Sequence, residues 1–322
     1  MRQVTLGRTK ATVSAISLGT WSYGGSNTIG DRSVGWSGHD DETAKQALIR
    51  AWELGINHWD TADAYGNGRS EELIGEMWDA AVARKDIFLA TKLGWVMGPH
   101  DHYYHPDFMR HQIELSLKLL KTDVIDLLYL HHCMFGDADE FFDPAIEVLR
   151  RAKEEGKIRF IGLSDWDPKA ILKYADKTNP DVIQPYRNVM DDDYVTSGLR
   201  AWVHQHNVGV AFFSPLKHGL LTGKYTEPTT FPVGDMRSGV PEFSDPIVLA
   251  KIREANKTLT ATFSTHPQPV LHGLLDVLLT DTPTGCVLLG QRSPAQVEAA
   301  ALAGTEMAKR DAEWVRSLYR AC

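Results

Sequence analysis

Four residues whose side chains could share proton chemistry stand where three apolar runs of the sequence end. Asp60 closes the run 56–60, Lys92 closes the run 87–92 and His131 follows the run 124–130, while Tyr65 lies five residues beyond Asp60. A phenol has an ordinary pKa of about 10, and an adjacent ammonium favours the phenolate and lowers that pKa. With Asp60 holding Lys92 and His131 orienting a carbonyl oxygen, such a set could protonate a developing alkoxide. The set contains no nucleophile, so hydride delivery from an external donor is its natural partner reaction.

Each of these residues taken alone has an ordinary structural explanation. Asp60 and Lys92 could form a structural ion pair, and a single histidine such as His131 is more often part of a core. The four indicate a functional site only if the fold brings the three strand ends together.

The apolar runs alternate with helical segments along most of the chain. Eight runs read as buried strands, nearly all followed by a helix: 16–20, 56–60, 87–92, 124–130, 158–164, 182–184, 208–213 and 286–290. Their continuous apolar character is typical of parallel strands that are covered on both faces. A doubly wound sheet would carry a glycine-rich fingerprint after its first strand, and none is present.

The sequence therefore predicts an α/β protein with a (β/α)₈ TIM barrel as a single domain over residues 1–322. We expect an N-terminal β-hairpin from residues 4–6 and 12–13, and extra helices at the C-terminal end. The chemistry of such barrels lies at the C-terminal ends of the strands. Because neighbouring strands lie about 4.8 Å apart, the ends of three consecutive strands converge on one patch.

The composition excludes several other classes. The chain has 322 residues and a formal net charge of −8, which gives no electrostatic case for a nucleic-acid partner. No apolar run approaches the roughly 20 residues of a membrane helix. Cys133, Cys286 and Cys322 are far apart and show no pairing pattern, which fits a reducing compartment. We expect a cytoplasmic protein that acts on a small molecule, and the composition leaves its oligomeric state open.

Several motifs add a resemblance to this interpretation. They are Asp60-Thr61-Ala62-x-x-Tyr65-Gly66, Ala90-Thr91-Lys92, residues 125–131, Gly162-Leu163-Ser164, and Ser214-Pro215-Leu216 followed by residues 219–224. Over essentially its whole length the chain resembles the aldo-keto reductase superfamily, in the bacterial branches related to potassium-channel β subunits. The resemblance implies NADPH-dependent reduction of an aldehyde or ketone to an alcohol, with Tyr65 as the proton donor and Asp60, Lys92 and His131 completing the catalytic set.

The resemblance also implies where a nicotinamide cofactor binds without a Rossmann domain. The implied cofactor contacts are Thr20, Trp21, Asp60, Ser164, Asp165, Gln184, Phe213, Ser214, Pro215, Leu216, Gly219, Lys224, Arg237, Gly290, Arg292 and Gln296. Ser164, Asp165 and Gln184 would hold the carboxamide, and Phe213 would stack on the nicotinamide ring. Backbone N–H groups with one cation, Lys224, suit a pyrophosphate.

Two features bear on the choice of cofactor. Arg292 supplies a bidentate partner for the adenosine 2′-phosphate, which favours NADPH. Ala299 and Ala300 stand where the family often has Glu-Asn for the adenine, so NADH stays possible. Asp165 also departs from the commoner Asn or Arg at its position.

The resemblance places mainly aromatic residues around the substrate. They are Trp21, Tyr23, Trp36, Trp95, His132 and Trp166, with Trp36 in the first loop covering the site. Loops set specificity in this fold, so these residues are expectations for the pocket and do not name a substrate.

Two other function classes stay open. A metal-dependent hydrolase on the same barrel is suggested by residues 131–133 and by His100, His102 and His105, but such enzymes typically need His-x-His where residues 19–21 read Gly-Thr-Trp. We therefore expect no metal. The other alternative is a cofactor-binding regulatory or redox-sensing subunit with low turnover, as in channel β subunits. Those tend to lack the histidine that His131 supplies here.

Overall fold

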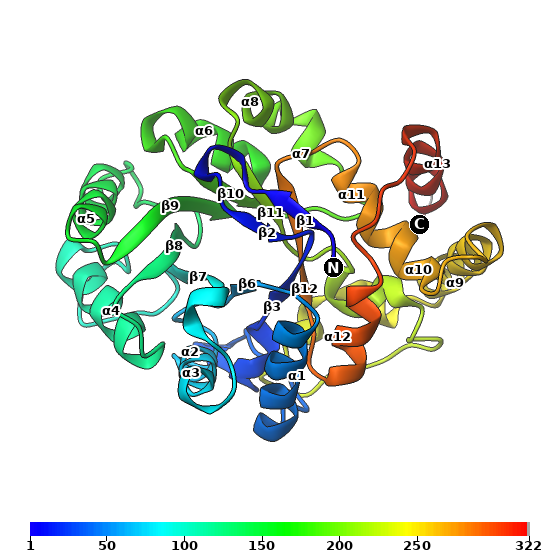
Figure 1. Cartoon of the computed structure of the whole chain (residues 1–322), viewed down its shortest axis with the longest axis horizontal. Helices are drawn as coiled ribbons and strands as arrows, with labels where there is room; N and C mark the ends of the chain where they lie inside the picture. The colour runs from blue at the N-terminus through cyan, green and yellow to red at the C-terminus, as the bar shows by residue number, and fades with distance from the viewer. Residues whose placement is uncertain (321–322) are drawn as a thin grey trace.

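Eight parallel strands close into a barrel in the computed structural model, which describes residues 1–320 (Figure 1). In order around the barrel the strands are β3 (Ile16–Gly19), β6 (His58–Asp60), β7 (Phe88–Leu93), β8 (Ile125–Leu130), β9 (Ile158–Asp165), β10 (Val182–Pro185), β11 (Gly209–Phe212) and β12 (Gly285–Gly290). The last strand pairs with the first, Leu289 opposite Leu18, so no edge is left open. The predicted (β/α)₈ barrel is confirmed.

Helices surround the barrel and cover its outer face (Figure 1). They are α1 (Asp41–Glu53), α2 (Arg69–Gly75), α3 (Met77–Ala80), α4 (Pro106–Leu119), α5 (Phe142–Glu154), α6 (Pro168–Thr178), α7 (Asp193–Thr196), α8 (Leu199–His206), α11 (Val277–Leu279) and α12 (Pro294–Ala301). Helix α6 illustrates the local rules: the Asp167 side chain accepts a hydrogen bond from the Lys169 amide, Pro168 follows the cap, and Asn179 ends the helix at a φ of 49°.

A hairpin of β1 (Gln3–Thr5) and β2 (Thr12–Ser14) crosses one end of the barrel, as predicted (Figure 1). At its turn Gly7 has a φ of +50°, and a Cβ there would lie 2.3 Å from the Gly209 nitrogen. Only glycine permits this approach. The Arg8 amide donates to the Asn207 carbonyl over 2.6 Å, so the hairpin is fastened at the start of β11.

Helices α9 (Pro246–Thr262), α10 (Pro269–Leu271) and α13 (Lys309–Tyr319) lie together on one side of the molecule, next to the C-terminal end (Figure 1). The expected extra C-terminal helices are therefore present. Short 3₁₀ turns complete the chain: η1 (Gly7–Thr9), η2 (Trp21–Gly24), η3 (Arg84–Asp86), η4 (Lys217–Thr222), η5 (Met236–Gly239) and η6 (Pro241–Ser244), with a π-turn, η7 (His272–Asp276). Within the described chain, none of the helices combines the length and apolar character that crossing a bilayer requires.

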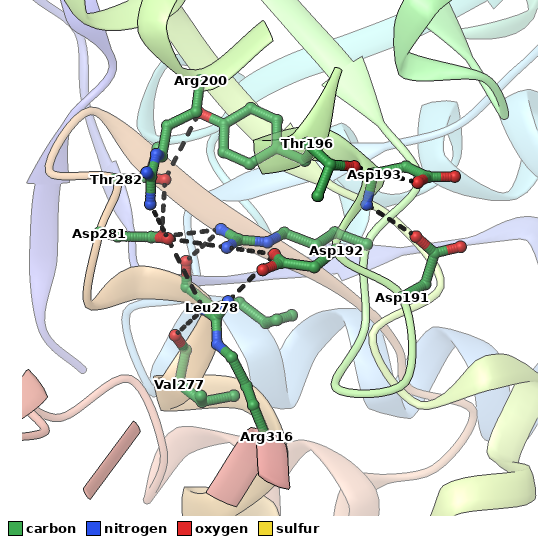
Figure 2. Close-up of polar contacts among 12 residues, drawn as sticks. Asp191, Asp192, Asp193, Thr196, Arg200, Val277, Leu278, Asp281, Thr282 and Arg316 are labelled. Carbon is green, nitrogen blue, oxygen red and sulfur yellow. Dashed lines mark hydrogen bonds and ion pairs between the residues drawn. The ribbon is translucent and has the colours of Figure 1, made fainter. Parts of the chain in front are cut away.

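An ion network around the buried Arg187 joins the segment after β10 to the C-terminal helices (Figure 2). Arg187 is fully buried, and its two terminal nitrogens each lie 2.8 Å from an oxygen of Asp281. Arg200 donates to the same carboxylate over 2.9 Å, and Arg316 on α13 donates to Asp192 over 3.1 Å. Because each charge has a partner, the network can stay buried and lock these helices onto the barrel.

The first long loop is more ordered than its glycine content suggests. Residues 25–38 form a small hairpin of β4 (Thr28–Ile29) and β5 (Arg32–Ser33), which the sequence did not predict. Backbone bonds from the Asn27 and Gly35 amides to the Gly234 carbonyl, both 3.1 Å, hold this hairpin against the long loop after β11. We call residues 25–38 the first-loop hairpin.

Candidate active site

The barrel brings the ends of β6, β7 and β8 together, as the sequence analysis expected. Asp60 ends β6 and pairs in register with Ala90, and Lys92 on β7 lies opposite Tyr129 of β8. The His131 amide donates to the Leu93 carbonyl over 2.8 Å, which fixes the turn after β8. The four candidate residues therefore meet at one end of the barrel.

Lys92 is the centre of this group. Its Nζ donates to Asp60 Oδ1 over 2.5 Å, to the Thr61 carbonyl over 2.7 Å and to the Tyr65 hydroxyl over 3.1 Å. Lys92 and Asp60 are almost fully buried, and Gln184 Nε2 donates to the second Asp60 oxygen over 2.8 Å. The ammonium thus uses all three of its donors, and both carboxylate oxygens have a partner.

The pKa values of the site residues reflect two opposing effects, burial of each side chain and its pairing with its neighbours. Burial alone would lower the pKa of Lys92, but the Asp60 charge and the Tyr65 oxygen outweigh it and raise that pKa, so the proton stays on Lys92. Burial raises the pKa of Tyr65 above its usual value despite the opposing effect of Lys92. The net direction for Tyr65 is opposite to the lowered pKa expected from sequence, because desolvation of the phenol outweighs its neighbouring cation. Burial together with Lys92 and His132 lowers the pKa of His131 well below its usual range, so this imidazole is neutral near pH 7.

Close backbone contacts set the position of Tyr65. A Cβ added to Gly24 would lie 2.4 Å from the Gly66 nitrogen, so the turn that carries Tyr65 rests directly on η2. The Tyr65 ring stacks on Trp21 with ring centres 5.9 Å apart and meets His131 edge-on at 5.8 Å. The phenol is therefore held by rings on two sides and by Lys92 below.

A cavity of about 530 Å³ opens above this group, a size typical of small-molecule sites. Its wall contains most of the residues expected from sequence. Those present are Thr20, Trp21, Trp36, Asp60, Tyr65, Trp95, His131, Ser164, Trp166, Gln184, Phe213, Ser214, Pro215, Leu216, Gly219, Lys224, Arg237, Gly290, Arg292 and Gln296. Lys92 lies directly beneath the wall and reaches the cavity through Tyr65.

One part of the wall suits phosphate groups. Ser214, Lys217 and His218 have positive φ angles of 54°, 44° and 58°, and such turns direct successive backbone N–H groups to one side. Lys224 and Arg292 line the same cavity, and neither forms an ion pair within the described residues. Burial and the charge of Arg237 lower the pKa of Arg292.

Arg237 differs from those two cations because it is already neutralised. Its Nε and Nη2 donate to the two oxygens of Asp235 over 2.9 and 2.6 Å, and its guanidinium carbon lies 4.6 Å from the centre of the Trp36 ring. Arg237 therefore shapes the wall, and Lys224 and Arg292 supply the positive charge of this part of it.

Three of the expected contact residues lie outside the cavity wall. Tyr23 is fully buried, and its hydroxyl donates to the Gln291 carbonyl over 2.7 Å. The Asp165 carboxylate accepts the backbone N–H groups of Cys133 and Asp167 over 2.7 and 2.8 Å, which leaves it engaged with its own loop. His132 packs beneath Trp95 with its Nε2 2.5 Å from the Gly94 carbonyl. None of the three lines the cavity, and each has partners in the surrounding structure, so their contact with cofactor or substrate stays a prediction.

Other residues of the wall were missed by sequence reasoning. The main ones are Ile29, Arg32, Val34, His218, Tyr225 and Met236. His218 lies between the motif residues Leu216 and Gly219, and this place in the sequence was the one sign that it could line the cavity. The first-loop hairpin carries Ile29, Arg32 and Val34, and no sequence motif predicts the fold of this hairpin.

The histidines that suggested a metal do not gather ligand atoms at the barrel mouth. The rings of His100 and His105 stack 3.9 Å apart, and neither they nor His102 form a group that could share an ion. In the described chain the one such group is His266, His272 and Asp276. Its Asp276 carboxylate already accepts the Gly304 and Thr305 amides over 2.6 and 3.0 Å and is engaged by His272.

Comparison with known proteins agrees with this geometry. The Aldo/keto reductase family profile matches residues 15–319. This chain belongs to the aldo/keto reductase family. It is 30% identical over 301 residues to the aldo-keto reductase YhdN of Bacillus subtilis, covering 93% of this chain and 87% of that protein.

Two further relatives bear on the branch and the fold. A probable voltage-gated potassium channel subunit beta of Oryza sativa subsp. japonica is 30% identical over 235 residues, 70% of this chain and 67% of that protein. A solved glycerol dehydrogenase from Gluconobacter oxydans superposes with a TM-score of 0.79 at 27% identity, over 98% of this chain and 94% of that one. This aldo/keto reductase is therefore an oxidoreductase that uses a nicotinamide cofactor.

Proposed function

We propose that this chain catalyses the reversible NADPH-dependent reduction of an aldehyde or ketone to an alcohol, with Tyr65 as general acid. The observation that carries the proposal is the position of Lys92 Nζ, which joins Asp60 to the Tyr65 hydroxyl at the floor of the cavity. An acid that faces an aromatic-lined cavity and has a cation directly behind it suits the protonation of an alkoxide.

The cavity wall offers a place for each part of the cofactor. Gln184 uses its Nε2 on Asp60, which leaves its Oε1 and the Ser164 hydroxyl for a carboxamide. Backbone N–H groups near Ser214 and the Lys224 ammonium would hold the pyrophosphate, and Arg292 the 2′-phosphate. The Arg292 guanidinium, which has no ion-pair partner among the described residues, favours NADPH over NADH.

When bound, the reduced nicotinamide supplies a hydride to the carbonyl carbon. Tyr65 gives its proton to the carbonyl oxygen as negative charge grows there. A phenol with a raised pKa stays protonated until that stronger base develops, and Lys92, 3.1 Å away, then stabilises the phenolate. Neutral His131 can donate one hydrogen bond to the same oxygen. Alcohol oxidation reverses these steps, with the Tyr65 phenolate accepting the proton.

The test is NADPH oxidation with a panel of aldehydes, ketones and sugars, comparing the parent with Tyr65→Phe. We expect the variant to bind NADPH with unchanged affinity and to lose turnover by about 10²- to 10⁴-fold, the usual contribution of general-acid catalysis. Tyr103→Phe is the matched control, because the Tyr103 hydroxyl bonds the Met134 carbonyl outside the cavity wall.

Equal turnover of Tyr65→Phe and the parent would refute the assignment of the acid. A parent that binds NADPH tightly but turns over no carbonyl compound would favour the alternative, a cofactor-binding regulatory subunit. The similarity to a potassium channel β subunit is the reason to keep that alternative in the experiment.

A further inference from the structure

Arg32 is a cation in the cavity wall that the proposed cofactor site does not use. Four basic residues line the cavity: Lys224, Arg237 and Arg292 are assigned to the cofactor or to Asp235, and Arg32 remains. It stands on the first-loop hairpin, far in sequence from the other three. Within the described chain no carboxylate lies within ion-pair distance of its guanidinium, and no hydrogen bond to its side chain is present.

Arg32 is connected through Trp95 to His131, at the reacting end of the cavity. Its guanidinium carbon lies 6.0 Å from the centre of the Trp95 ring, and that ring meets His131 edge-on with centres 6.1 Å apart. One guanidinium-to-ring contact and one ring-to-ring contact therefore link Arg32 to His131, a residue that faces the carbonyl oxygen in the proposed reaction.

The hairpin that carries Arg32 is held firmly. The Gly234 amide donates to Ser33 Oγ over 2.9 Å, and Trp21 Nε1 donates to the Val34 carbonyl over 2.8 Å. Because the two residues after Arg32 are fastened, the backbone that carries the guanidinium is ordered before a ligand binds.

The charges around the cavity indicate what Arg32 could bind. The chain carries a net charge of −8, which repels anions in general, and Asp60 alone is acidic among the described lining residues. Asp60 is already paired with Lys92. An anionic group that enters the substrate half of the cavity therefore meets one available cation, Arg32, whose planar fork fits a carboxylate.

We propose that Arg32 is a specificity-determining residue and that the preferred substrates are aldehydes or ketones that carry a carboxylate at the end remote from the carbonyl. This inference rests on the proposed function and adds the substrate class. The rings of Trp21, Trp95 and Trp166 favour a planar or aromatic body between the two groups.

The kinetic test compares 4-carboxybenzaldehyde with 4-methylbenzaldehyde, which has the same shape without the charge. For the parent we expect kcat/KM to favour the carboxylate. Arg32→Met should lower kcat/KM for the carboxylate about tenfold, mainly through KM, and leave the neutral aldehyde unchanged. Tenfold is the lower end for a hydrogen bond to a charged group, as suits an exposed arginine. Arg32→Lys should restore part of the loss.

Arg253→Met is the matched control, because it removes an exposed arginine of α9 that does not line the cavity. Arg253→Met should leave kcat/KM unchanged for both aldehydes. Equal kcat/KM of the two aldehydes in the parent, or an equal loss for both in Arg32→Met, would overturn the inference while leaving carbonyl reduction intact.

A second measurement separates this inference from the proposed function. The probes are 4-carbamoylbenzoate and 4-methylbenzamide, two amides that the enzyme would bind without reducing. Their binding to the NADPH-loaded protein can be followed by tryptophan fluorescence. The parent should bind the carboxylate more tightly, and Arg32→Met should abolish the difference. If Arg32→Met leaves the preference unchanged, the inference is wrong even where turnover is present.

Discussion

The buried pair of Lys92 and Asp60 should be strongly coupled in stability as well as in catalysis. Both side chains are almost fully buried, and their atoms lie 2.5 Å apart. Removing one partner of such a pair leaves an uncompensated buried charge, which typically costs about 3–5 kcal/mol of unfolding free energy. We expect this for both Lys92→Met and Asp60→Asn.

The double variant Asp60→Asn/Lys92→Met removes both charges together. Gln184 Nε2 keeps an oxygen acceptor at position 60, and no charge is left without a partner. The cost of the double variant should therefore fall short of the sum of the single costs by at least about 2 kcal/mol. The two variants that lack Lys92 should lose turnover because Tyr65 loses the ammonium that stabilises its phenolate. Asp60→Asn should lose turnover because Lys92 loses the carboxylate that keeps it charged.

The assay is urea unfolding of the cofactor-free protein, followed by tryptophan fluorescence and far-ultraviolet circular dichroism, with coincident transitions required. The surface pair Lys45–Glu76 is the matched control, because its atoms are also 2.5 Å apart while both side chains are about one-third exposed. The cycle Lys45→Met/Glu76→Gln should give a much smaller coupling. Additive costs at positions 60 and 92 would refute the interpretation of the pair.

Two further predictions concern other parts of the chain. Arg292→Met should raise the KM for NADPH about 10- to 100-fold and leave the KM for NADH unchanged. Steady-state kinetics with both cofactors measures the two KM values. Equal effects on the two KM values would exclude a contact between Arg292 and the 2′-phosphate. Asp281→Asn should lower the unfolding free energy by about 3–5 kcal/mol at pH 7, because it strips the buried Arg187 of its bidentate partner. Although burial opposes it, Arg187 holds the pKa of Asp281 below its usual value, so this contribution is present above about pH 4 and is lost as pH falls through the folded-state pKa. Urea titrations between pH 3 and 7 should therefore show a steeper loss of stability on acidification in the parent than in the variant.

The barrel and the placement of the four candidate residues could be predicted from sequence because they depend on local patterns. Each strand is a short apolar run with a helix after it, and parallel pairing then puts Asp60, Lys92 and His131 at one edge. The motif residues from Ser214 to Leu216, with Gly219 and Lys224, line the cavity, and their contact with a phosphate stays a prediction. The extent of the domain, 1–322, and the cytoplasmic location stay predictions.

Features that depend on distant partners could not be predicted. The resemblance placed Tyr23 in the substrate pocket, yet its hydroxyl donates to the carbonyl of Gln291, 268 residues away, and its side chain is fully buried. Arg187 gave no sign that it would be buried, because its carboxylate partner Asp281 lies 94 residues further along the chain. The direction of the Tyr65 pKa shift was missed for a related reason: a sequence names the neighbouring charge but does not give the extent of desolvation.

Asp235 illustrates how such distant contacts organise the site. One oxygen accepts the Ser37 amide and hydroxyl over 2.9 and 2.6 Å, and the carboxylate also binds Arg237 through both oxygens. Arg292 donates to the Ser37 carbonyl over 2.9 Å, so the arginine assigned to the 2′-phosphate touches the first-loop hairpin as well. The hairpin that carries Arg32 and the loop that carries Arg237 therefore share one buried carboxylate. Because a change in either segment alters the partners of Asp235, the substrate end and the cofactor end of the cavity are parts of one connected wall.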